Sequence, residues 1–266
     1  MAMSDDEKIR LGGMALPNGV LVHGPNSWAC AIRDQDGRVE VASAYKRFRA
    51  ANVNSPFLRG PARLAEALAL LPQVKRALPG AQLPMQSRRV VSAMLAAAFV
   101  VRGIRDSGRM RPAAQELLAG FLSLAPAALA LRGGELAAYH GAEHISIGRY
   151  EHGDGATKEH ERCGGHLIGP LLATSAVGNV LAGLAPARMR NHARAAAQLG
   201  AVAASTEIFG WMTRNPDNLV AQALSKPGHE LQHRFSTAEP TPEQLEVAEA
   251  ALAACLELEH GADDQN

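Results

Sequence analysis

The most informative part of this chain is His140-Gly141-Ala142-Glu143-His144, together with the segment His160-Glu161-Arg162-Cys163-Gly164-Gly165-His166 that follows it. Apolar residues at 136–138 come just before it and indicate a helix that approaches the core. Residues four apart lie above one another on one helix face, so His140 and His144 can direct their imidazoles at one metal ion. Glu143 adjoins the pair and can act on metal-bound water. We expect any chemistry to lie here.

A metal site of this kind needs further ligands. His160 and Cys163 are nominated because imidazole and thiolate are both good zinc ligands, and the two lie three apart in a glycine-rich turn. Glu151 follows His144 by seven residues, which is about 10 Å of helix rise. That is too far for a shared ion unless Gly148 breaks the helix, so Glu151 is a weaker candidate.

Glu207 is a second unusual carboxylate, because residues 195–212 are otherwise almost uncharged. A carboxylate in an apolar helix must be paired, protonated or metal-bound. Pairing with an arginine remains an equal alternative. The candidate residues are therefore His140, His144, His160 and Cys163 for a metal, and Glu143 and Glu207 for catalysis.

Simpler interpretations of these residues stay open. A histidine near the core is most often satisfied by one hydrogen bond, and Cys163 can be a small buried hydrophobe. The pattern H-x-x-E-H is also the inverted zinc-peptidase motif, but five positions are too few to indicate a peptidase.

Composition narrows the classes of function. The chain has 266 residues, a net charge of +1 and only 4% aromatic residues, which argues against a nucleic-acid binder. Its three cysteines are too few and too scattered for a disulfide framework, which favours a reducing cytoplasm. The polar start, residues 1–8, lacks the apolar core of a signal peptide.

Apolar runs at 90–101, 117–131 and 167–185 are interrupted by polar residues, proline or glycine. None is a clean span of the roughly 20 apolar residues that a bilayer requires. We therefore expect a soluble cytoplasmic protein, with a homo- or hetero-oligomeric state left open.

The N-terminal fifth of the chain predicts β structure. Residues 20–22 are a short strand candidate, and residues 28–33 and 38–42 flank a turn that ends in Asp36-Gly37. Glycine supplies the positive φ that a hairpin turn requires.

A helical body is predicted to follow. Leucine and valine recur at helical spacing over 64–74, and further helices are predicted at about 87–104, 113–131, 135–148, 167–184 and 190–213. After Pro227 we expect a strand or extended arm, and Thr241-Pro242-Glu243-Gln244 then predicts a capped C-terminal helix. The fold class is α+β, as one domain over 1–266 with a β-rich part at about 12–50, a helical body at about 60–226 and a C-terminal arm and helix at about 227–258.

With these motifs in hand, the chain resembles the DUF1385 (YqhQ-like) family of predicted metal-dependent enzymes. Tyr139–His144, Tyr150-Glu151 and His160–Gly164 carry the resemblance. Further similar blocks are Gly12-Gly13, Gly19-Val20, Gly24-Pro25, the segment 56–60, the segment 205–207, and the C-terminal Pro227-Gly228, Leu231-Gln232, Thr237, Glu239-Pro240 and 246–248. The resemblance implies a metal site, and it implies no particular reaction.

The chain departs from the family pattern in three respects. Family members have long membrane-spanning helices, whereas the matching stretches here are shorter and rich in alanine. Gly165 stands where the family has threonine, and His23 where it has arginine. These departures predict a divergent soluble member with a changed substrate.

We expect a metal-dependent enzyme, with zinc as the preferred ion, that acts on a small molecule by hydrolysis, elimination or internal displacement. One such role is a ring-forming tailoring step of specialised metabolism, catalysed by a hydrolase, lyase or cyclising transferase-like enzyme. The alternative is a non-catalytic ligand-binding or partner subunit, with a structural metal site or none. A structural site would be closed by four protein ligands, and a catalytic site would keep one position open.

Overall fold

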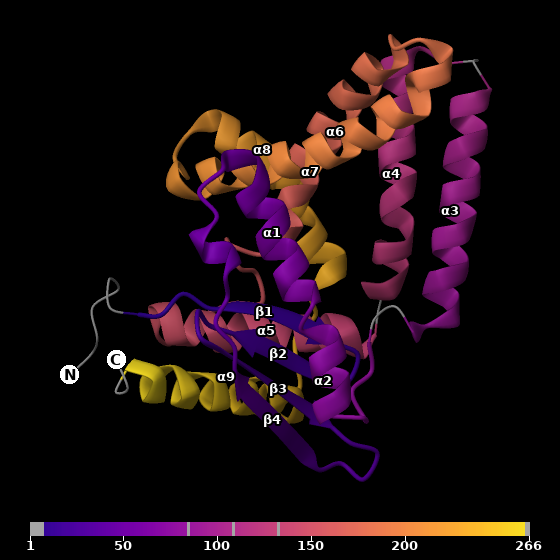
Figure 1. The fold of residues 1–266 in the computed structure, drawn as a ribbon. Helices are drawn as coiled ribbons and strands as arrows, with labels where there is room; N and C mark the ends of the chain where they lie inside the picture. Colours follow the sequence, from indigo (N-terminus) through magenta and orange to yellow (C-terminus); the bar gives the residue numbers. More distant parts are fainter. Residues whose placement is uncertain (1–7, 84–85, 108–109, 132–133, 264–266) are drawn as a thin grey trace.

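The computed structural model describes residues 8–83, 86–107, 110–131 and 134–263. It shows an α+β fold in which a four-stranded antiparallel sheet comes first and helices make up most of the rest, as the sequence predicts (Figure 1). The helices are α1 (Pro56–Leu68), α2 (Leu71–Ala77), α3 (Arg88–Asp106), α4 (Pro112–Leu131), α5 (Glu135–His152), α6 (Ile168–Gly183), α7 (Arg190–Arg214), α8 (Leu219–Leu231) and α9 (Pro242–Asp263).

The sheet has the strand order β1 (Gly12–Leu16), β2 (Gly19–His23), β3 (Ser27–Arg33) and β4 (Val39–Tyr45). The predicted hairpin is present between β3 and β4, and Gly37 in its turn has a φ of 81°. Strand β1 was not expected, because its sequence Gly-Gly-Met-Ala-Leu resembles turn punctuation.

Both faces of the two central strands are buried, so they alternate between two cores rather than between core and solvent. The first core joins one face of the sheet to α5 and α9, and the second joins the other face to α2 and the residues on either side of it (Figure 1). Successive strand residues point to opposite faces. The first core contains Val20, Val22, Ala29, Ala31, Tyr139, Ala142, Val247, Ala248, Ala251 and Cys255, and the second Leu16, Leu21, Trp28, Cys30, Ile32, Leu70, Val74, Leu78 and Ala81.

Helix α9 is fixed at both ends. At its start, Gln244 Oε1 accepts the Thr241 N–H at 2.9 Å, and the Thr241 hydroxyl accepts the Gln244 N–H at 3.3 Å, which is the predicted capping box. Near its end, the buried Glu259 carboxylate accepts from the Ser27 hydroxyl at 2.6 Å and the Asn26 N–H at 2.8 Å. These bonds attach α9 to the turn between β2 and β3.

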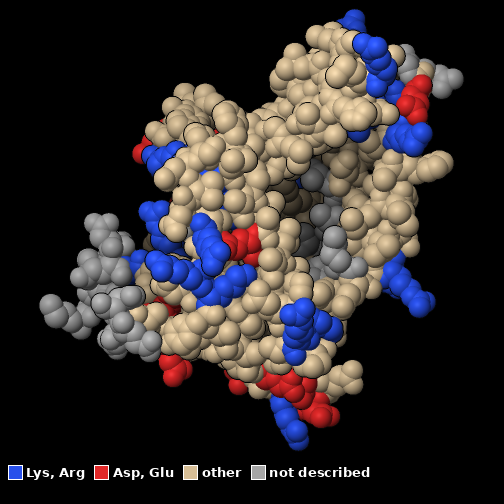
Figure 2. All heavy atoms as spheres, in the orientation of Figure 1, with Lys and Arg blue, Asp and Glu red and all other residues tan. Residues whose placement is uncertain are grey.

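Helices α3, α4, α6 and α7 pack on one another and extend away from the sheet (Figure 1). Figure 2 shows the middle of this extension as mostly uncharged, with charged side chains gathered near its far end and a basic group at the end of α3 that is nearer the sheet. Large apolar side chains lie exposed on it, among them Leu95 (69% exposed), Phe99 (82%), Leu181 (61%) and Leu199 (74%). Within the described ranges, one helical stretch, Gly164–Gly183, has the length and composition of a membrane span, and 28% of its apolar window is buried. The core helix of a protein outside membranes can have the same length and composition, although such a helix is mostly buried.

The prediction of an extended arm after Pro227 is wrong. Pro227 lies inside α8, and the chain continues from α8 directly into the π-helical segment η5 (Gln232–Ser236). Proline weakens a helix through its missing N–H, but packing outweighs that cost here. The backbone of Gly228 lies against Gly165 and His166, so this part of α8 is held in place by a long-range contact.

Candidate metal centre

Helix α5 lies between the sheet and the candidate site. Tyr139 and Ala142 face the sheet core, and His140 and His144 lie on another face of the same helix. Opposite them lie the turn η3 (Gly164–Leu167), which follows Cys163, and the segment η5. The site is thus assembled from three separate parts of the chain.

His140 has one ring nitrogen engaged and the other free to bind a metal. Its Nδ1 lies 2.7 Å from the backbone oxygen of Ser236. A carbonyl can only accept, so Nδ1 carries the proton and Nε2 has a free lone pair. That Nε2 lies 3.5 Å from Cys163 Sγ.

His144 is held in the same tautomer by a different carbonyl. Its Nδ1 lies 2.5 Å from the backbone oxygen of Lys158 and donates to it. Burial, with a smaller contribution from the nearby His140, lowers the pKa of His144 to about 3. The ring is therefore neutral at physiological pH, as a metal ligand must be.

Cys163 contributes the sulfur. It is the N-cap of η3, and its Sγ accepts the Gly165 N–H at 3.3 Å. Burial raises the pKa of this thiol to about 12 in the metal-free protein. A metal that binds Cys163 would displace the thiol proton, so binding would depend on pH.

The three candidate donor atoms lie close together, and one of their separations matches that in a tetrahedral zinc site. The ligand atoms of His140, His144 and Cys163 all lie within 4.8 Å of one another. Tetrahedral zinc, with Zn–N near 2.0 Å and Zn–S near 2.3 Å, sets nitrogen and sulfur about 3.5 Å apart. The separation between His140 Nε2 and Cys163 Sγ is 3.5 Å. Two imidazoles and a thiolate form a donor set suited to a borderline-soft ion.

Glu143 adjoins this cluster but lies toward the sheet. Its carboxylate packs against Gly13 of β1 so closely that a Cβ there would overlap it, which explains the need for glycine at this position. Burial raises the pKa of Glu143 to about 8. Glu143 is not among the described residues that line the adjacent cavity.

His160 lies beside the cluster rather than in it. Its ring centroid is 5.6 Å from that of His144, and its Nε2 donates to Glu151 at 3.1 Å. Its Nδ1 accepts the Arg162 N–H at 3.3 Å, so both ring nitrogens are engaged. The role of His160 as a metal ligand therefore stays a prediction that requires this ring to leave its present partners.

Glu151 binds two residues of the loop that precedes Cys163, and these partners balance its negative charge. Besides His160, it is paired with the Arg162 guanidinium. Burial raises the pKa of Glu151, but the hydrogen bond from His160 and the charge of Arg162 outweigh burial, so the pKa is lowered overall. Glu151 thus lies next to the ligands without joining them.

The structure does not bring Glu207 to the cluster. Its carboxylate forms a bidentate pair with Arg59, in which Nε and Oε1 lie 2.6 Å apart, and this pair joins α1 to α7. The pairing with an arginine that the sequence left open is the one observed. The expected catalytic role of Glu207 has no geometric support here.

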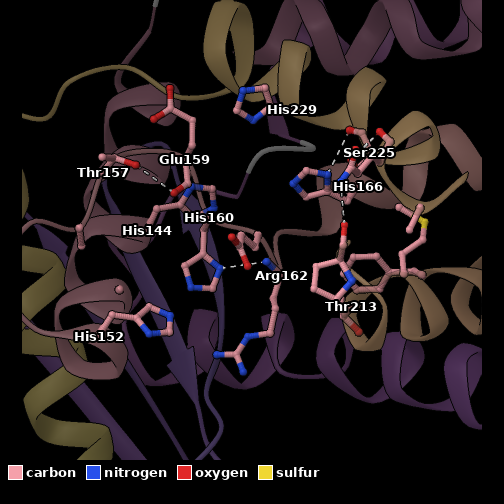
Figure 3. A pocket seen from close by; sticks show the side chains of 18 of the residues that line it. His144, His152, Thr157, Glu159, His160, Arg162, His166, Thr213, Ser225 and His229 are labelled. Atoms are coloured by element: carbon pink, nitrogen blue, oxygen red, sulfur yellow. Dashed lines mark hydrogen bonds between the residues drawn. The ribbon is translucent and has the colours of Figure 1, made fainter. Parts of the chain in front are cut away.

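A cavity of about 930 Å³ opens beside the cluster. His144 and His160 form part of its wall, and Ser225, His166 and His229 lie across from them (Figure 3). Apolar side chains such as those of residues 209 and 212 line part of it, and charged side chains such as those of Glu159 and Arg162 line another part. The cavity is large enough for a small organic molecule.

Sequence reasoning missed the groups that orient the ligands. Two are backbone carbonyls, of Ser236 and Lys158, which no sequence pattern identifies. A third is Gln232, which is completely buried and bonds to the loop that carries Cys163. The resemblance of Leu231-Gln232 to a family block was the available signal for it.

Fold and site together define an α+β protein with a candidate centre of two histidines and one cysteine, next to a cavity of about 930 Å³. Over residues 135–258 the chain matches the model of the family described as protein of unknown function (DUF1385). The match contains α5, the Cys163 turn and η5, hence every residue of the cluster. No curated protein and no solved structure gives a significant match.

Proposed function

We propose that this chain is a metal-dependent enzyme that acts on a small molecule, with zinc as its preferred ion. The single observation that carries the proposal is the shared tautomer of His140 and His144. Each donates Nδ1–H to a backbone carbonyl, and one ring nitrogen of each lies within 4.8 Å of the Cys163 sulfur, with His140 Nε2 at 3.5 Å. Histidine ligands of metals are typically held in this way by carbonyls or carboxylates.

The three residues would hold the ion and leave a coordination position for substrate or water, as three-ligand catalytic zinc sites do. When bound, such an ion supplies Lewis acidity and activates water near neutral pH. The ring of His144 also forms part of the cavity wall, so a molecule in the cavity lies beside the centre. This arrangement supports hydrolysis, elimination or internal displacement, including a ring-forming step, in a cytoplasmic setting.

Proton transfer is assigned to Glu143 in this proposal. The buried carboxyl adjoins the ligand His144 and carries a proton up to about pH 8 in the metal-free protein. A carboxyl that is protonated at neutral pH can act as a general acid. In addition to burial, its charge would lie close enough to Cys163 to raise the pKa of that thiol, which supports action on groups at the metal rather than at the far end of the cavity.

A non-catalytic subunit with a closed structural site is the alternative. A closed site needs a fourth protein ligand. His160, whose ring centroid is 5.6 Å from that of His144, is the candidate for this role, and Glu151 and Arg162 occupy its nitrogens. The geometry therefore favours an open site.

The test is metal content in protein that was purified without a histidine tag. We expect about one equivalent of transition metal per chain, and the double variant His140→Ala, His144→Ala should bind none. The matched control is His229→Ala, His233→Ala, which removes another pair four residues apart whose stacked rings are 6.4 Å apart.

That control should keep the native metal content, because His229 and His233 are not part of the cluster. Zinc binding no tighter than millimolar in the native protein would overturn the proposal. Equal loss of metal from both double variants would show that the binding is not specific to this centre.

A further inference from the structure

Gln232 is the residue that connects the two sides of the candidate centre. It is the first residue of η5, and Ser236, whose carbonyl holds His140, is the last. Its side chain is 0% exposed and points into the loop that carries Cys163. A π-helical turn is rare and is often found at functional sites.

The Gln232 amide binds that loop at two points. Its Oε1 accepts the His160 N–H at 2.9 Å, and its Nε2 donates to the His166 Nε2 at 2.9 Å. The His166 Nδ1 lies 3.2 Å from the Ser225 carbonyl and donates to it, and because the Gln232 Nε2 can only donate, the His166 Nε2 accepts.

Cys163 lies between these two points and is attached to both. Its N–H donates to the His160 carbonyl at 3.2 Å, and its own carbonyl accepts the His166 N–H at 3.0 Å. Two linked turns therefore run from His160 to His166 through Cys163, with the Gln232 amide bound at each end. The amide oxygen and nitrogen are held at a fixed separation within one planar group. They therefore fix the distance between the His160 N–H and the His166 ring, which are the two ends of the loop.

We infer that Gln232 is a positioning residue that fixes the Cys163 sulfur relative to His140. The inference rests on the proposed metal centre. Gln232 is not one of the candidate ligands. It acts on Cys163 through the loop from His160 to His166, and on His140 through η5, which carries the Ser236 carbonyl. Substitution of a residue that orients a metal ligand typically lowers metal affinity by about 10–100-fold.

The probe is Co²⁺ bound to the protein at saturating concentration, together with zinc affinity from competition titration. A cobalt–thiolate bond gives a near-ultraviolet charge-transfer band, which reports the sulfur separately from the histidines. For Gln232→Met, which keeps the length of the side chain without its polar groups, we expect a band of less than half the native intensity. Its zinc dissociation constant should rise at least about tenfold.

A matched control exists in Gln244. It is also buried, its Oε1 also accepts a backbone N–H at 2.9 Å, and its Nε2 donates to the Glu135 carboxylate at 2.7 Å. Gln244→Met therefore loses a similar pair of bonds, but away from the cluster. We expect it to lower the melting temperature while it keeps the native cobalt band and zinc affinity.

Gln232→Glu keeps the test decisive if Gln232→Met does not fold. It retains an acceptor for the His160 N–H, so we expect more than half of the native band. The inference fails if Gln232→Met keeps the native band and affinity, or if a folded Gln232→Glu loses the band completely. It also fails if Gln244→Met loses the band equally. A native protein with no cobalt–thiolate band would instead overturn the metal centre itself.

Discussion

At the scale of single residues, the candidate centre depends on protons held in fixed places. The Nδ1 protons of His140 and His144 are bound to carbonyls 96 and 14 residues away along the chain. A fixed tautomer removes the need to reorganise the rings when a metal binds, which favours binding. The histidine pair is visible in the sequence, but the carbonyls that orient it depend on the tertiary fold.

Glu143→Gln tests the proton-transfer role at this scale. Glutamine keeps the shape of the protonated acid beside Gly13 but cannot transfer a proton. We expect native metal content and a melting temperature close to native, with turnover of a small-molecule substrate reduced by about 10²–10⁴-fold. Metal analysis, thermal unfolding and steady-state kinetics measure the three quantities.

Two results would contradict this assignment. Metal content or melting temperature that falls together with activity would make Glu143 a ligand or packing group. Undiminished turnover with full metal would remove Glu143 from the mechanism.

The candidate residues were predictable to different extents, for physical reasons. His140, His144 and Cys163 meet because a helix brings residues four apart together and the loop that follows α5 returns the cysteine to the pair. Glu207 is held by Arg59, which lies 148 residues away, and no local pattern reveals such a partner. His160 was a reasonable candidate ligand from its residue type and spacing, but its contact with Glu151 depends on the tertiary fold and is not visible in the sequence.

At the scale of elements, packing decides where the local signals are weak. Strand β2 and the hairpin of β3 and β4 follow from apolar runs and the Asp-Gly turn. The continuation of α8 through Pro227 does not, because the contact of Gly228 with His166 that holds it is long-range. Local propensity and tertiary packing disagree in α8, and packing prevails.

Helix α5 can be tested through its glycine. A Cβ at Gly141 would overlap the backbone oxygen of Ala238, just after η5, whereas a Cβ at Gly103 in α3 meets nothing within 4 Å. We expect Gly141→Ala to lower the free energy of unfolding by more than about 1 kcal/mol and to weaken metal binding, because backbone must move.

Gly103→Ala is the control and should raise the free energy of unfolding by about 0.5–1 kcal/mol, since alanine is the better helix former. Urea unfolding measures both variants. A Gly141→Ala protein that is as stable as the native chain would show that α5 and the segment after η5 are not in this close contact.

The α1–α7 contact gives a prediction about pH. Hydrogen bonds from Arg59 lower the pKa of Glu207 below its ordinary value of 4.5. The stabilisation is therefore present above about pH 4.5 and is lost as the pH falls through the lower folded pKa. Glu207→Gln should be less stable than the native protein at pH 7, and the difference should disappear in acid.

Chemical unfolding at a series of pH values measures this difference. The control is Glu230→Gln, which removes an exposed pair between α8 and Arg234, four residues further along the chain in η5, and should change stability little. A Glu207→Gln deficit that is the same at pH 7 and in acid would mean that packing, and not charge, joins α1 to α7.

At the scale of the whole molecule, α5 belongs to the sheet core and to the candidate centre at once. The chain therefore cannot lose its sheet packing and keep the site. Metal that binds only the folded state should stabilise the molecule as a unit. At a free zinc concentration of about 100 times the dissociation constant, the gain is about 2.7 kcal/mol, or roughly 5–10 °C in melting temperature. Calorimetry with and without zinc measures it, and the His140→Ala, His144→Ala variant should show no shift. If zinc leaves the melting temperature of the native protein unchanged, zinc binding at this site does not stabilise the folded state and the prediction is wrong.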